Sequence, residues 1–206
     1  MKVLMISFLV FLLIACDYTY KEKTTEQPKA AVYFTLGDVT INGLPVRTGQ
    51  LLNQDDLIQT GSESLLEVKF GRQSGFSVRE ESEVVFNSTD EISLTVKKGK
   101  VLSMLEKNSN YSVRTPAAVA AVRGTIFFAD VLNPDSVYFC ACNGTIAIED
   151  ENKTKLKQLS SAHHEANFVE KENQQPVFHE AGMFEHTDLE IFQFMYRLDN
   201  AVKQDK

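Results

Sequence analysis

The sequence predicts an all-β fold, a solenoid-like or sandwich-like stack of short strands that is followed by one C-terminal amphipathic α-helix. Apolar and polar residues alternate in short runs between residues 31 and 149, for example at residues 66–70 and 92–96. This two-residue period is typical of half-buried strands. Turn-forming residues recur at a spacing of about ten residues, which favours an all-β stack. The 14 Phe and 6 Tyr residues also favour packed β structure over disorder.

Residues 1–15 are predicted to be a signal peptide. Lys2 precedes an apolar run over residues 3–14 that only Ser7 interrupts. A transmembrane helix needs about 20 apolar residues, so this run is too short to span a bilayer but suits the core of a signal peptide.

A cysteine directly follows this segment. Leu13, Ile14, Ala15 and Cys16 resemble a bacterial lipobox, in which the cysteine becomes the first residue of the mature protein and is acylated by fatty acids such as palmitate. Each buried acyl CH₂ contributes about 0.8 kcal/mol, so several chains on one cysteine hold a protein stably at a membrane. The alternative is an ordinary cleaved signal peptide followed by an incidental cysteine. Residues 16–30 are polar and charged, and they are predicted to be the lipidated, flexible tether.

Residues 31–149 are predicted to be one β domain. Alternating apolar residues place strands at residues 39–41, 66–70, 76–78 and 92–96. The Asn-Gly pairs at residues 42–43 and 143–144 and the Lys-Gly pair at residues 98–99 are predicted to be turns, because glycine adopts backbone conformations that other residues resist.

The stretch from residue 111 to residue 128 is predicted to be a tightly packed crossing of the chain. Thr115-Pro116 interrupts regular structure, because proline lacks a backbone N–H. Small apolar residues follow, and Arg123-Gly124-Thr125 separates them from a second apolar run. Small residues and glycine allow close approach of the backbone. The charge of Arg123 needs a partner if it is buried, so we expect Arg123 to pin the crossing.

This stretch resembles the signature of the FecR-domain family, in which a Thr-Pro turn precedes small residues and an Arg-Gly-Thr segment with an aromatic residue. Further similarities occur at residues 37–39, 58–61 and 99–101, and the resemblance covers residues 31–149. It implies a compact domain of short strands that is not an enzyme and that binds or signals in the bacterial envelope.

The best-known members of that family relay signals from an outer-membrane receptor to a cytoplasmic sigma factor, and they carry a cytoplasmic segment and an internal transmembrane helix. This sequence shows neither segment, so direct control of a sigma factor is not expected. The expectation is the extracytoplasmic module alone, on a lipid tether, on the periplasmic side or at the cell surface. Its expected partners are the membrane and another envelope protein or a glycan.

Two further cysteines, Cys140 and Cys142, lie in a predicted strand, where residues i and i+2 share one face. A disulfide between such near neighbours is strained. Two thiols on one face suit Zn²⁺ or another soft metal ion when histidines complete a tetrahedral set. All the histidines follow in the sequence: His163, His164, His179 and His186.

The four histidines allow several alternative sets of metal ligands. His163 and His164 project to opposite sides of an extended chain, so we expect only one of them to join a site, together with His179 or His186. The spacing matches none of the compact zinc motifs. The alternatives are a functional, reducible thiol pair and cysteines that only pack in the core.

Residues 150–206 are predicted to be an extension that ends in a helix over residues 187–202. Thr187 and Glu190 match a capping box, in which each side chain bonds the backbone N–H of the other residue. The helix then has one wide apolar face. We expect it to cover an open edge or end of the β domain, and the alternative is a helix that docks a partner.

The formal net charge of −7 argues against nucleic-acid binding, which requires basic surfaces. The sequence contains no phosphate loop, dinucleotide motif or nucleophile elbow. It therefore predicts a lipid-anchored, non-enzymatic binding or signalling protein. The rival hypothesis is an envelope sensor or carrier that depends on a metal or on the thiols of Cys140 and Cys142.

Overall fold

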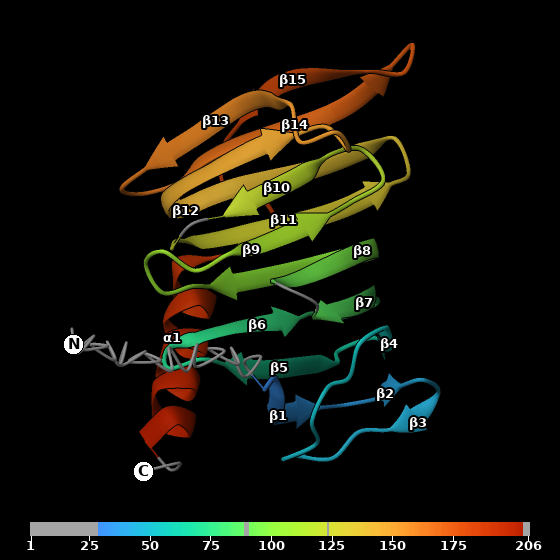
Figure 1. Ribbon diagram of the computed structural model, residues 1–206, viewed down its shortest axis with the longest axis vertical. Helices are drawn as coiled ribbons and strands as arrows, with labels where there is room; N and C mark the ends of the chain where they lie inside the picture. Colours follow the sequence, from blue (N-terminus) through green and yellow to red (C-terminus); the bar gives the residue numbers. More distant parts are fainter. Residues whose placement is uncertain (1–28, 89–90, 123, 204–206) are drawn as a thin grey trace, which may run out of the picture.

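The structure is a computed structural model that describes residues 29–88, 91–122 and 124–203, drawn in colour in Figure 1. These residues form fifteen strands and one helix. The predicted signal peptide, Cys16 and most of the predicted tether lie outside them, and so does Arg123. Among the described residues, no helix is long and apolar enough to span a membrane.

The strands pair into two sheets that share two long members. Sheet A contains β1 (Ala31–Leu36), β5 (Leu65–Phe70), β6 (Ser74–Val78), β11 (Ile126–Asn133), β14 (Glu165–Glu172) and β15 (Gln175–Ala181). Sheet B contains β2 (Val39–Ile41), β3 (Leu44–Pro45), β4 (Asp56–Thr60), β7 (Glu83–Ser88), β9 (Tyr111–Arg114), β10 (Val119–Val122) and β13 (Lys155–Ser161). The shared members are β8 (Ile92–Met104) and β12 (Ser136–Glu149).

The pairing order gives a tall stack with a closed ring at its middle. Sheet A runs β1-β5-β6-β8-β11-β12-β14-β15, and sheet B runs β3-β2-β4-β7-β8-β9-β10-β12-β13. Because β8 and β12 belong to both sheets, β8, β9, β10, β12 and β11 close into a small barrel. Figure 1 shows this ring between β13–β15 above and β1–β5 below. The predicted all-β stack of short strands is confirmed.

Two predicted turns are wrong, because the glycines bend strands instead of ending them. Lys98 pairs with β7 in sheet B, whereas Gly99 pairs with β11 in sheet A. In β12, Asn143 pairs with β11 and Gly144 pairs with β13. Both glycines have a positive φ, 84° at Gly99 and 117° at Gly144, which residues with a side chain rarely adopt. A positive φ therefore lets one strand leave one sheet and continue in the other.

The main apolar core contains side chains from both sheets. Phe76 of β6 and Phe86 of β7 are almost completely buried, and their rings stack with centroids 6.2 Å apart. This contact joins sheet A to sheet B. Burying such rings removes a large apolar surface from water, which is the main stabilising contribution in a core of this kind.

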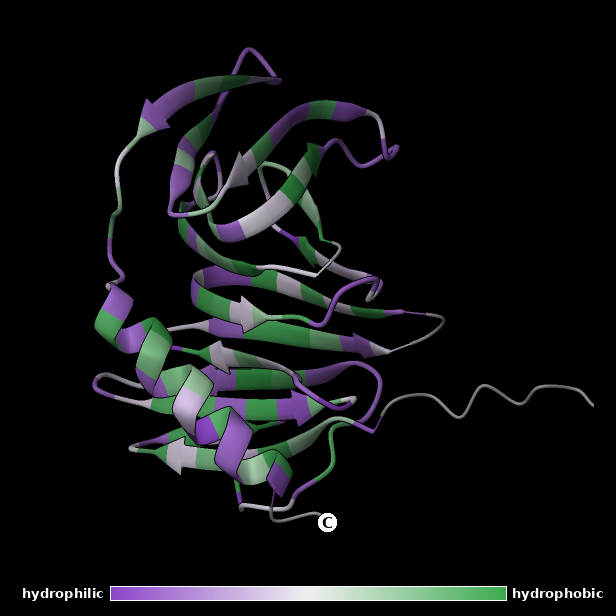
Figure 2. Ribbon diagram, turned by 90° about the vertical axis from the view of Figure 1, so that its left-hand side faces the viewer, coloured by the Kyte–Doolittle hydropathy of each residue, from purple (hydrophilic) through white to green (hydrophobic). Residues whose placement is uncertain are grey.

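The helix α1 (Asp188–Lys203) lies along the outside of the stack, as Figure 2 shows. Its buried face, Ile191, Phe194 and Leu198, packs in a second apolar cluster that includes Leu102 of β8 and Phe128 of β11. α1 therefore covers the outer face of sheet A, and the helix predicted for residues 187–202 is confirmed to within one residue.

A buried ion pair adds a polar contact to this packing. Glu67 of β5 is completely buried, and Arg197 of α1 donates from Nε to its two carboxylate oxygens at 3.0 and 2.9 Å. The Arg197 guanidinium also lies over the ring of Phe34, 5.1 Å from its centroid. A buried carboxylate is tolerated only when it is paired in this way, so the pair fixes where α1 lies on sheet A.

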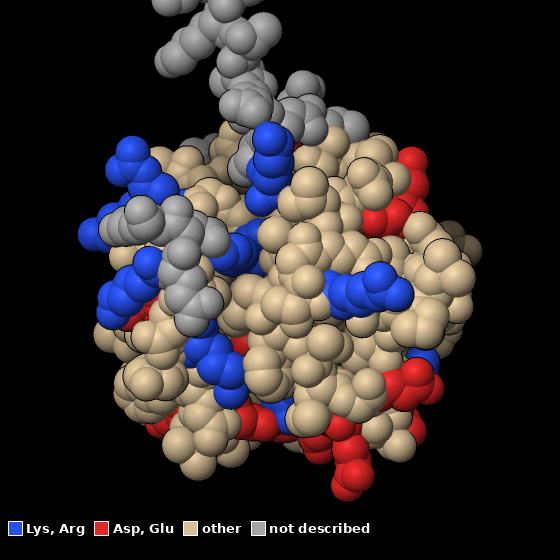
Figure 3. Space-filling view, turned by 90° about the horizontal axis from the view of Figure 1, so that it is seen from below, with Lys and Arg blue, Asp and Glu red and all other residues tan. Residues whose placement is uncertain are grey.

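The end of the stack that β1–β3 and the C-terminal part of α1 form is seen in Figure 3. Lys and Arg are scattered there among uncharged residues, mostly in the left half of the view, and Asp and Glu lie along the right-hand and lower rim. The face in this view is therefore of mixed charge.

Candidate metal centre

Cys140 and Cys142 lie on the face of β12 that points away from the main core. Their neighbours Phe139 and Ala141 belong to the main core, whereas the two cysteines belong to the cluster under α1. This alternation confirms the predicted shared face of the cysteines. The thiols are free, and their Sγ atoms are 3.8 Å apart.

His164 reaches Cys140 from the connection between β13 and β14. Its backbone has a positive φ of 54°, and its N–H donates to the carbonyl oxygen of Cys142 at 3.1 Å. This bond holds the connection against β12. The imidazole then lies with Nδ1 3.4 Å from the Sγ of Cys140.

His186 reaches Cys142 from the segment that precedes α1. Its ring stacks on Phe128 with centroids 4.4 Å apart, and the residue is only 4% exposed. Nε2 lies 3.5 Å from the Sγ of Cys142. Two residues later the helix begins, capped as predicted: Thr187 N–H donates to Glu190 at 2.8 Å, and Glu190 N–H donates to the Thr187 hydroxyl at 3.3 Å.

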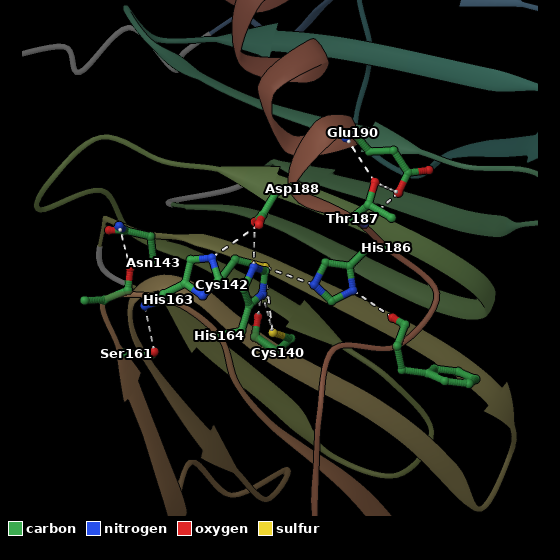
Figure 4. Close-up of polar contacts among 12 residues, drawn as sticks. Cys140, Cys142, Asn143, Ser161, His163, His164, His186, Thr187, Asp188 and Glu190 are labelled. Carbon is green, nitrogen blue, oxygen red and sulfur yellow. Dashed lines mark hydrogen bonds and ion pairs between the residues drawn. The ribbon is translucent and has the colours of Figure 1, made fainter.

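Both histidines use their second ring nitrogen in a further hydrogen bond (Figure 4). His164 Nε2 lies 2.9 Å from a carboxylate oxygen of Asp188, in the first turn of α1. His186 Nδ1 lies 2.7 Å from the carbonyl oxygen of Phe184. Sequence spacing gives no sign that Asp188 meets His164, because that contact depends on where α1 lies on the sheet.

The cluster shifts the acidity of its members. The hydrogen bond with Cys142, followed by those with His186 and His164, lowers the pKa of the Cys140 thiol to about 4, although burial opposes the change. The same contact with Cys140, together with burial, raises the pKa of Cys142. Burial of His164 opposes a higher pKa, but the hydrogen bonds with Asp188 and Cys140 outweigh it and raise the pKa of His164.

Two of the candidate histidines lie outside the cluster. The His163 side chain is 73% exposed, with Nε2 3.3 Å from the second carboxylate oxygen of Asp188. His179 lies on β15, 3.6 Å from a carboxylate oxygen of Glu170. Of the six candidate ligands, Cys140, Cys142, His164 and His186 form one group, and their ligand atoms all lie within 4.8 Å of one another.

The signature stretch lies where the chain passes from sheet B to sheet A. Thr115 turns the chain between β9 and β10, with its hydroxyl accepting from the Ala118 N–H at 3.1 Å. β10 ends at Val122 in sheet B, and the chain is next found in sheet A as β11, which begins at Ile126. At Gly124, φ is 75° and an added Cβ would lie 2.8 Å from the carbonyl oxygen of Glu106. Thr125 donates to the carbonyl oxygen of Asn143 on β12. Pro116 accepts a hydrogen bond from Lys171.

A hollow of about 540 Å³ lies on sheet B, over β9, β10, β12 and β13. The short side chains of Ser112, Ala121 and Ala147 line it, together with the charged Arg114 and Glu149. It is formed because short side chains on adjacent strands leave space above the sheet.

Comparison with known proteins finds one family and a distant structural likeness. Residues 56–147 match the family described as FecR protein. A solved structure described as a "putative anti-sigma factor" from Parabacteroides distasonis shares 12% sequence identity with the chain, at a TM-score of 0.49. That match covers 60% of this chain and 59% of the other. No curated protein matches the chain.

Proposed function

We propose that the chain is a lipid-anchored bacterial envelope protein that binds another protein and takes part in signalling without catalysing a reaction, because residues 56–147 match the FecR family. The observation that carries the proposal is the family match, which spans β4 to most of β12 and includes the whole ring of strands except its last residues. The FecR family is one of envelope-associated signalling regulators.

The anchor in this proposal is Cys16. It follows an apolar run that is too short to span a bilayer and long enough to direct export. Fatty acids on its side chain and amino group would hold the mature chain at a membrane. The polar residues 16–30 would then connect the lipid to β1, which begins at Ala31.

The proposed partner is a second protein of the envelope. Two described faces of different chemistry are available to it. The hollow on sheet B combines short side chains with charged ones. The outer side of α1 exposes Leu189, Phe192 and Tyr196, each by more than 60%. Aromatic side chains and arginine are enriched in protein interfaces.

Photo-crosslinking in living cells tests the proposal. A photo-reactive amino acid at Ala121, in the hollow, or at Tyr196, on α1, should join the lipidated chain to one envelope protein. Cys16→Ser should release the chain from the membrane fraction and abolish the crosslink. Tyr18→Phe is the matched control, because it changes a nearby side chain and retains Cys16.

Crosslinks to glycan alone would contradict a protein partner. A chain whose membrane association survives Cys16→Ser would contradict the lipid anchor.

A further inference from the structure

We infer that Cys140, Cys142, His164 and His186 form a closed tetrahedral site for Zn²⁺, and that the ion ties the start of α1 to β12. The site is independent of the proposed anchor and of the proposed partner, because it depends only on residues under α1 and in the adjoining connections.

Three of the six distances between ligand atoms match the edges of a tetrahedral zinc site, and all six are within 4.8 Å. Zinc bonds of about 2.3 Å to sulfur and about 2.0–2.1 Å to nitrogen give tetrahedral edges of about 3.8 Å between two sulfurs and about 3.5 Å between sulfur and nitrogen. The Sγ atoms of Cys140 and Cys142 are 3.8 Å apart. The Sγ of Cys140 lies 3.4 Å from Nδ1 of His164, and the Sγ of Cys142 lies 3.5 Å from Nε2 of His186.

The hydrogen bonds around the cluster prepare both imidazoles as ligands. A carbonyl oxygen only accepts, so the bond to Phe184 requires the proton of His186 to be on Nδ1 and leaves the Nε2 lone pair directed at Cys142. In the neutral form of His164, the carboxylate of Asp188 likewise accepts from Nε2, which leaves the Nδ1 lone pair directed at Cys140. Carboxylate and carbonyl acceptors of this kind orient most histidine ligands of metal ions.

Burial and charge favour an ion in the cluster. Cys140 is completely buried, Cys142 and His186 are each 4% exposed, and the His164 side chain is 9% exposed. Two buried thiolates are costly without a cation, whereas two thiolates and Zn²⁺ are neutral together. Sulfur and imidazole ligands select zinc-like ions over Mg²⁺ and Ca²⁺, and four protein ligands leave no open position, as in structural zinc sites.

The ligands come from three segments that are far apart in the sequence. Two lie on β12, one lies in the connection between β13 and β14, and one lies directly before α1. An ion held by all four therefore acts as a crosslink. Hydrogen bonds among the two sulfur atoms and the two imidazoles would account for the same contacts without a metal, and this explanation predicts no metal uptake.

The test uses the full chain, purified in detergent, stripped with a chelator and titrated with Zn²⁺ and with Co²⁺. We expect one Zn²⁺ per chain by elemental analysis. We also expect the visible and near-ultraviolet absorption bands of tetrahedral Co²⁺ with thiolate ligands. Cys142→Ser and His186→Gln should each weaken zinc affinity at least about 100-fold, since each removes a ligand. His179→Gln is the matched control and should bind as tightly as the unchanged chain.

Asp188→Ala separates a positioning role from a ligand role. It should retain one Zn²⁺ per chain with about 10- to 100-fold lower affinity, because Asp188 only orients His164. Because a variant can fail to fold, a second measurement uses the unsubstituted chain. The melting temperature of that chain, after stripping, should rise when Zn²⁺ is restored. The inference is overturned if the stripped, folded chain takes up no Zn²⁺ and no Co²⁺. It is equally overturned if His179→Gln loses the ion as the ligand variants do.

Discussion

The positions of His164 and His186 in the cluster could not be predicted from the sequence, whereas the shared face of the two cysteines could. The strand period of two correctly placed Cys140 and Cys142 on one face, because that pattern depends only on local backbone geometry. The choice among four histidines did not follow from the sequence. His164 depends on a positive φ and a bond to β12, and His186 depends on stacking against Phe128. Both contacts are made only in the folded chain.

Gly124 allows a prediction that separates backbone conformation from crowding. Gly124→Ala should lower the free energy of unfolding by more than about 2 kcal/mol, because a side chain is disfavoured at its φ of 75° and the added Cβ would lie 2.8 Å from the Glu106 carbonyl oxygen. Gly43 has the same φ of 75° but no neighbouring atom within 4 Å. Gly43→Ala should therefore cost only about 1 kcal/mol. Urea unfolding measures both; equal losses would show that the crossing is not tightly packed.

At the scale of elements, the helix was predictable and the course of the long strands was not. The capping box and the apolar face of α1 are local patterns, and the structure confirms both. The glycines at residues 99 and 144 suggested turns, because glycine is the commonest residue where a chain reverses. In β8 and β12 it instead allows a bend between two sheets, and the need to pair both halves of the strand decides the outcome.

The covering role of α1 gives a matched pair of substitutions. Phe194 is 1% exposed and Phe192 is 64% exposed. Phe194→Ala should lower the free energy of unfolding by about 3–5 kcal/mol, since it leaves a cavity against sheet A. Phe192→Ala should change it by less than about 0.5 kcal/mol. Thermal or urea unfolding followed by circular dichroism distinguishes the two, and similar small effects would mean that α1 does not stabilise the stack.

For the whole molecule, the sequence indicated the fold class but not how far the sheets extend. The fifteen strands form one continuous network, because β8 and β12 join sheet A to sheet B. The FecR resemblance ended near residue 149, yet β13, β14 and β15 continue the pairing beyond it. The pairing of β13 and β14 with β12, and of β15 with β14, shows that these strands extend the same stack.

The central proposal, a FecR module held at the envelope by lipid, is tested most directly by mass spectrometry of the N-terminal peptide of the protein extracted from membranes. The account predicts a mature chain that starts at Cys16 and carries the added mass of fatty acyl groups. A mature chain that starts at another residue, or one in which Cys16 is unmodified, would contradict it.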